Sequence, residues 1–201
     1  MRVPEDFPRY LSAHEDCTEK LLCQAEDFSA QDLEISIDPQ AAELRKMVYG
    51  VVAEVHRMKG FVRLSSLGPH ILYGRLKPRH RIGEHISDHF ARKNPQTIIV
   101  LGNSTESWVS LYQGGVFQRL HCGGLNETLE RLKSDLGGID DSSEGDIEAA
   151  WKIYYDSQNC QERRNMGAFH RHMPERDLGS AGLTTERNKN GVTLEDFFGS
   201  R

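Results

Sequence analysis

The segment from His56 to Arg63, HRMKGFVR, concentrates side chains that are suited to binding an anion. Arg57, Lys59 and Arg63 supply positive charge, and Gly60 allows a backbone to approach closely. This composition predicts a phosphate clamp. The alternative is that the cations stabilise the C-terminal end of a helix, where the helix dipole favours positive charge. Charge alone does not separate the two interpretations.

A second group of polar residues lies in the segment RIGEHISDHFARK, residues 81–93. His85 and His89 are four positions apart, a spacing at which two histidines on one helix can hold zinc. The pattern is not H-E-x-x-H and no third ligand is evident, so a hydrogen-bonded histidine pair is favoured over a metal site. No cofactor is indicated. His89, Arg92 and Lys93 join the residues expected to contact nucleic acid.

The chain contains no recognisable catalytic motif. A G-x-S-x-G elbow, a P-loop and a G-x-G-x-x-G fingerprint are all missing from the sequence. We therefore expect a binding protein. The alternative is a nucleic-acid-modifying enzyme in which His56, His89 and the arginines form the site.

Charge is distributed unevenly along the 201 residues, whose formal net charge is −5. Residues 41–122 hold 12 Lys/Arg and 5 Asp/Glu, whereas residues 1–40 hold 3 and 10. Residues 123–148 are also acidic, with 2 Lys/Arg and 8 Asp/Glu. A basic body between two acidic segments indicates a face that binds a polyanion, although a mixed solvated surface gives the same totals.

Hydrophobic spacing predicts an α+β fold with a mainly antiparallel sheet of about five strands, helices packed on it and a helical C-terminal part. The expected helices are 18–25, 39–58, 81–93, 125–136, 146–158 and 161–173, with Gly60 ending the second. The expected strands are 33–37, 61–67, 71–77, 97–102, 106–112 and 116–121.

The expected organisation is an acidic N-terminal segment packed on the domain (1–38), an α+β domain (39–178), and a polar linker with a C-terminal tail (179–201). No apolar run is long enough to span a bilayer and no secretory signal is present, so a cytoplasmic protein without membrane contact is expected. The four cysteines match no zinc or redox motif and are expected to be free thiols: Cys17, Cys23, Cys122 and Cys160.

Aromatic residues at helical spacing occur near the C-terminal end. Trp151, Tyr154 and Tyr155 stand at i, i+3 and i+4, which is typical of a core stripe. Arg163 and Arg164 follow, and aromatics mixed with arginines can also clamp a single strand of nucleic acid. Core packing is favoured for Trp151.

Three segments together resemble a family of DNA-metabolism and DNA-repair proteins whose domain has no assigned function. They are HRMKGFVRL (56–64), ISDHFARKNP (86–95) and AAWKIYYDSQNCQERRNMGAFHRHMP (149–174). Members are often fused to a uracil-DNA-glycosylase-like domain or encoded beside a radical-SAM protein. The resemblance implies that these positions are important: His56, Arg57, Gly60, Phe61, Arg63, His89, Phe90, Trp151, Tyr154, Tyr155 and Arg163.

The sequence also departs from that family's pattern. Leu64 replaces an aromatic residue of the first motif, and Cys160 and Gln161 stand where Pro-Ala is common. Residues 175–178 replace the Tyr-Trp that usually follows Met-Pro, and a glycosylase domain is not expected after them. Glycosylase activity is therefore not carried over.

The C-terminal tail GVTLEDFF, residues 191–198, resembles the sliding-clamp (PCNA) binding box Gln-x-x-Leu-x-x-Phe-Phe. Leu194, Phe197 and Phe198 match the box, and Gly191 stands at the Gln position. The resemblance implies a clamp partner; the alternative is that these side chains fold back on the domain. We expect a DNA-metabolism accessory protein that binds DNA or RNA, or alternatively an interaction subunit for a radical-SAM partner.

Overall fold

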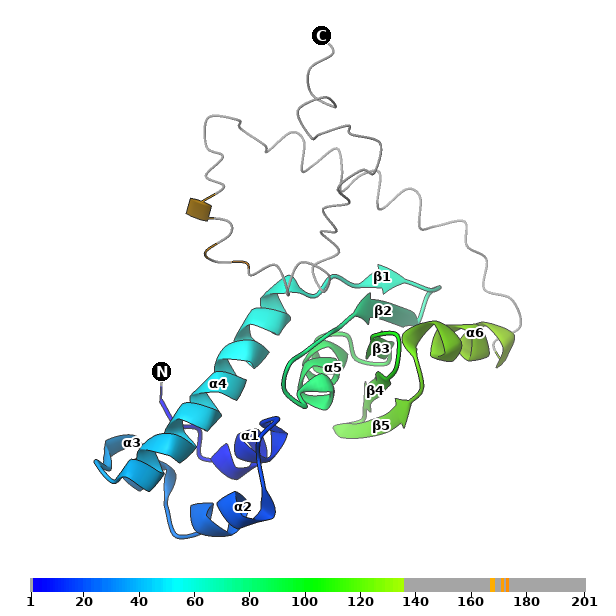
Figure 1. Cartoon of the computed structure of the whole chain (residues 1–201). Helices are drawn as coiled ribbons and strands as arrows, with labels where there is room; N and C mark the ends of the chain where they lie inside the picture. The colour runs from blue at the N-terminus through cyan, green and yellow to red at the C-terminus, as the bar shows by residue number, and fades with distance from the viewer. Residues whose placement is uncertain (1, 136–166, 169–170, 172, 174–201) are drawn as a thin grey trace.

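The computed structural model describes residues 2–135, 167–168, 171 and 173 (Figure 1). Within residues 2–135 it contains six helices and one five-stranded sheet. The helices are α1 (Phe7–Ala13), α2 (Glu19–Ala25), α3 (Ala30–Ile35), α4 (Pro39–Phe61), α5 (Gly83–Lys93) and α6 (Leu125–Asp135). The strands are β1 (Ser65–Ser66), β2 (Ile71–Arg75), β3 (Ile98–Gly102), β4 (Ser107–Gln113) and β5 (Val116–Cys122).

The sheet has the order β1-β2-β3-β4-β5. Three of its four strand pairs are antiparallel, and β2 pairs with β3 in parallel. The parallel pair arises because α5 lies in the connection between these strands. The helix returns the chain to the end of the sheet at which β2 begins, so β3 runs in the same direction as β2. The predicted α+β class with a mainly antiparallel sheet of about five strands is confirmed.

Helices α5 and α6 cover opposite faces of the sheet (Figure 1). Ile99 and Leu101 of β3 pack in one buried cluster with Ile86 of α5. Val100, which lies between them on the strand, packs in another cluster with Leu125 of α6. Because successive strand residues point to opposite faces, the two helices must lie on the two sides.

The long helix α4 connects the sheet to the three N-terminal helices. Its second half buries Val51, Val55 and Met58 in the cluster under α5. Its first half packs with α1 and α3 through a separate cluster that includes Phe7, Leu11, Leu33, Leu44 and Val48. Pro39 begins the helix as predicted, and the Asp38 side chain accepts a hydrogen bond from the Gln40 amide at 3.1 Å.

The predicted strand at residues 33–37 is wrong, because this segment contains the end of α3. Ser29 and Asp32 form a capping box at the start of that helix. The alternating apolar residues that suggested a strand do not share a buried face, since Leu33 is buried while Ile35 and Ile37 are 69% and 98% exposed.

The predicted end of the second helix at Gly60 is also wrong, since α4 continues to Phe61. Val62, the residue after the helix, is buried, so the apolar spacing of the helix runs through Gly60 into the core. Arg63 donates a hydrogen bond to the Gly60 carbonyl at 3.0 Å and so satisfies one of the last carbonyls of the helix.

The other predicted strands and helices up to residue 135 lie within a few residues of their predicted ranges, although the segment 61–67 contributes only the short β1, and α1 was not predicted. Cys17, Cys23 and Cys122 are free thiols. In the part of the chain that the structure describes, no helix has the length and apolar character needed to cross a bilayer. The predicted helix 146–158, most of 161–173, Cys160 and the tail 179–201 lie outside the described residues.

Candidate nucleic-acid interface

Two lysines lie at the C-terminal ends of the neighbouring helices α4 and α5. Lys59 lies in the last turn of α4 and Lys93 in the last turn of α5, where the helix dipole favours positive charge. Partial burial lowers the pKa of the Lys59 ammonium, and the charge of Lys93 lowers this pKa further. The two positive charges are therefore near enough to act on each other.

His89 lies on the same side of α5 as Lys93, one turn earlier. Burial lowers the pKa of the His89 imidazole, and the positive charges of Lys59 and Lys93 act in the same direction. We call these three residues, Lys59, His89 and Lys93, the lysine–histidine cluster. Within residues 2–135, none of the ion pairs of the structure gives a carboxylate partner to any of the three.

His85 lies one turn before His89 but is more deeply enclosed. Burial and the nearby Arg9 guanidinium lower the pKa of its imidazole to about 4, so the ring is neutral at pH 7. Its ring centroid lies 5.3 Å from that of Tyr10, and neither ring nitrogen has a hydrogen-bond partner among the described residues. Those residues contain no group of three or more His, Cys, Asp or Glu side chains placed to hold a metal ion.

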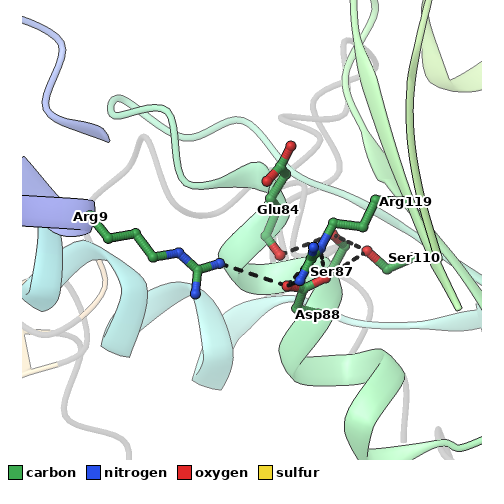
Figure 2. Close-up of polar contacts among 6 residues, drawn as sticks. All are labelled: Arg9, Glu84, Ser87, Asp88, Ser110 and Arg119. Atoms are coloured by element: carbon green, nitrogen blue, oxygen red, sulfur yellow. Dashed lines mark hydrogen bonds and ion pairs between the residues drawn. The ribbon is translucent and has the colours of Figure 1, made fainter. Parts of the chain in front are cut away.

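The buried Asp88 carboxylate joins α5 to the sheet next to the lysine–histidine cluster (Figure 2). Arg119 of β5 donates to Asp88 of α5, with Nε 2.9 Å from Oδ1 and Nη2 2.8 Å from Oδ2. The Ser110 hydroxyl of β4 donates to the same Oδ1 at 3.0 Å, and the Ser87 hydroxyl lies 2.9 Å from the Ser110 hydroxyl. Arg9 of α1 approaches Oδ2 to 3.8 Å.

This network fixes the orientation of α5. The Asp88 side chain is only 11% exposed, so its charge requires partners. Arg119 provides a bidentate ion pair that contacts both carboxylate oxygens. The hydrogen bonds to Asp88 raise the pKa of the Arg119 guanidinium. Since Asp88 precedes His89 by one position, the same contact helps to position the lysine–histidine cluster.

Aromatic rings and a second arginine lie beside Arg119. Tyr112 and Phe117 are directly opposite each other on β4 and β5, with ring centroids 4.7 Å apart. The guanidinium carbon of Arg92 lies over both rings, 5.8 Å from the Tyr112 centroid and 5.3 Å from the Phe117 centroid. That of Arg119 lies 4.9 Å from the Phe117 centroid.

The structure therefore brings together only part of the predicted set. Lys59, His89 and Lys93 form one cluster, with Arg92 on the adjacent position of α5. His56 is exposed on α4, and no hydrogen bond, ion pair or ring contact within residues 2–135 joins it to His89.

The other predicted residues have separate surroundings. Arg57 is half-buried, and Arg63 folds back to the Gly60 carbonyl. Phe61 is half-buried, and Phe90 packs against the main core. The remaining predicted site residues lie outside the described residues: Trp151, Tyr154, Tyr155, Arg163, Arg164, Leu194, Phe197 and Phe198.

Sequence reasoning missed Asp88, Arg119, Arg9 and Ser110. Asp88 and Arg119 are 31 positions apart, so no local pattern pairs them. One signal was present, because Arg119 is the only Lys or Arg between residues 94 and 130. A single charge within an otherwise uncharged strand commonly has a specific partner.

The fold defines an α+β domain in which a five-stranded mixed sheet lies between α5 and α6. The chain belongs to the family described as "domain of unknown function (DUF4130)", whose model matches residues 14–178. No curated protein and no solved structure is significantly similar to the chain.

Proposed function

We propose that this protein binds nucleic acid through the lysine–histidine cluster and acts as an accessory factor in DNA metabolism. The observation that carries the proposal is the lack of a carboxylate partner for Lys59 and Lys93 within residues 2–135. Holding like charges together costs folding free energy, and a polyanion would recover this cost on binding.

Two further features support this function. The cluster lies within the segment of the chain that carries a net charge of +7, residues 41–122. Its residues also fall within two of the motifs that resemble DNA-metabolism proteins, HRMKGFVRL and ISDHFARKNP. The enzymatic alternative would need His56 and His89 in one site, whereas His56 lies exposed on α4.

Fluorescence anisotropy with labelled DNA tests the proposal. We expect Lys59→Ala/Lys93→Ala to weaken binding by about tenfold at low salt, because two phosphate contacts are lost. Lys20→Ala/Lys46→Ala removes the same charge from exposed positions of α2 and α4 and is the matched control. Equal affinities of the two double variants would contradict the proposal. Complete failure of the wild-type protein to bind would favour the interaction subunit for a radical-SAM partner.

Recruitment to the sliding clamp is a second part of this proposal, based on the tail residues Leu194, Phe197 and Phe198. The three side chains would enter the clamp's hydrophobic pocket as one helical turn. Because Gly191 leaves the glutamine pocket unfilled, we expect an affinity of about 1 μM or weaker. Calorimetry with a peptide of residues 186–201 measures it, and a lack of competition with an established clamp-binding peptide would refute it.

A further inference from the structure

The end of the β4–β5 hairpin places an aromatic pair next to the cationic surface of α5. Tyr112 and Phe117 are the second cross-strand pair from the Gly114–Gly115 turn, and both rings are half-buried. Both glycines have positive φ values, +58° and +85°, which allow the tight turn that brings the two rings together. The two rings pack against the main core and add apolar surface at the end of the hairpin, and arginines lie over their faces.

The two arginines that contact this pair differ in their partners. Arg119 is bound to Asp88 through hydrogen bonds to both carboxylate oxygens. Arg92 is exposed, and no described residue forms a hydrogen bond or an ion pair with it. Its guanidinium lies over the rings with its N–H donors uncommitted, an arrangement in which arginine can stack and bind a phosphate together.

Arg92 also connects the aromatic pair to the lysine–histidine cluster. His89, Arg92 and Lys93 stand at i, i+3 and i+4 of α5, so their side chains emerge on one side of that helix. A nucleic acid whose phosphates contact Lys59 and Lys93 would therefore pass directly beside Arg92 and the Tyr112–Phe117 pair. The same helix carries both kinds of contact.

We infer that Arg92, Tyr112 and Phe117 form a stacking site for unpaired nucleobases, so that the preferred ligand is single-stranded nucleic acid. This inference rests on the proposed function and names its substrate class. In a duplex the base faces are stacked on one another and are not available to protein side chains, whereas a single strand can turn its bases onto aromatic rings and arginine planes. The alternative is that the Arg92 stem only shields the two rings from water.

The test compares three labelled probes of roughly 16 nucleotides: oligothymidylate, an abasic strand with the same phosphates, and a duplex. The full-length wild-type protein should bind oligothymidylate about tenfold more tightly than the abasic strand. Arg92→Lys keeps the charge and most of the stem but loses the planar group, and Phe117→Leu keeps apolar bulk but loses the ring. Both variants should lower the affinity for oligothymidylate towards that for the abasic strand and so remove the preference for bases.

Lys59→Ala/Lys93→Ala should instead weaken binding of all single-stranded probes by a similar factor. Thermal unfolding confirms that each variant is folded. If Phe117→Leu is unstable, Arg92→Lys still tests the stacking site, because Arg92 is exposed and its substitution leaves the core unchanged. Equal wild-type affinity for the abasic strand and oligothymidylate, or a base preference that survives both substitutions, would overturn the stacking site and leave the proposed function intact. Lack of binding to every probe would overturn both.

Discussion

The Asp88 carboxylate on α5 accepts hydrogen bonds from Nε and Nη2 of Arg119 on β5 at distances of 2.8–3.0 Å. The two residues belong to elements that are neighbours in space and 31 positions apart in sequence. Their contact fixes the helix that carries His89, Arg92 and Lys93 against the edge strand of the sheet (Figure 2).

Removing the charge of Asp88 should therefore destabilise the domain. Asp88→Asn keeps the shape of the side chain but leaves Arg119 without its counter-ion, and we expect the free energy of unfolding to fall by about 2 kcal/mol. The loss stays below that of a fully buried pair because the Arg119 side chain is 40% exposed.

Urea denaturation at neutral pH measures the effect of Asp88→Asn. The control is Glu130→Gln, which breaks an exposed ion pair with Lys133 and should change stability by less than about 0.5 kcal/mol. If the two variants were equally stable, Asp88 would have no part in holding α5 to the sheet.

The buried imidazole of His85 predicts a loss of stability in mild acid. The pKa of His85 in the folded protein is about 4, below its ordinary value of 6.5, chiefly because of burial. The unfolded chain therefore binds this proton more tightly, and stability declines as the pH falls from 6.5 towards 4. Lowered pKa values of His80 and His89, caused mainly by burial, act in the same direction.

His85→Phe keeps an aromatic ring beside Tyr10 but cannot accept a proton. The difference between the unfolding free energies at pH 7 and pH 5 should shrink by about 2 kcal/mol in this variant. His70→Phe adds the same ring at an exposed position and should leave the difference unchanged. An unchanged pH dependence in His85→Phe would show that His85 is protonated to the same extent in the folded and unfolded protein.

Two glycines of the helices should respond to alanine in opposite directions. A Cβ atom on Gly83 would lie 2.0 Å from the Trp108 ring, so Gly83→Ala should destabilise the fold by about 3 kcal/mol. A Cβ on Gly60 meets nothing within 4 Å inside α4, so Gly60→Ala should stabilise the fold by about 0.5–1 kcal/mol.

Thermal and urea unfolding of Gly83→Ala and Gly60→Ala measure both effects. The Gly60 variant has a second use, because Gly60 was also predicted to let a phosphate approach the backbone. Weaker DNA binding by a more stable Gly60→Ala protein would support that close approach, whereas unchanged binding would restrict Gly60 to the helix. Destabilisation by Gly60→Ala would contradict its placement within α4.

Much of the fold could be predicted because apolar spacing reports burial directly. Leu44, Val48, Val51 and Val55 follow the helical period and are all buried in α4. The pattern failed at residues 33–37, where Ile35 and Ile37 are exposed and the apparent alternation has no buried face behind it. The Arg45 guanidinium holds the C-terminal end of α3 in place by donating hydrogen bonds to the carbonyls of Leu33, Glu34 and Ser36. No local sequence pattern shows this contact.

The candidate site was predictable only in its charges. The basic residues around Lys59 and Lys93 are visible as a composition bias, and the cluster follows once α4 and α5 pack together. The Asp88–Arg119 contact and the position of Arg92 over Phe117 depend on the register between β4 and β5 and on where α5 crosses them. That information is carried by tertiary packing, and no spacing in the sequence encodes it.

The salt dependence of DNA binding tests the central claim most directly, because phosphate contacts release counterions in proportion to their number. The slope of log affinity against log salt concentration is measured for the wild-type protein and for Lys59→Ala/Lys93→Ala. We predict a steep wild-type slope that becomes shallower by about 1.4 for single-stranded DNA in the double variant, since each lost contact contributes about 0.7. A double variant with the wild-type slope would show that Lys59 and Lys93 do not contact the backbone, and would contradict the proposed function of the cluster.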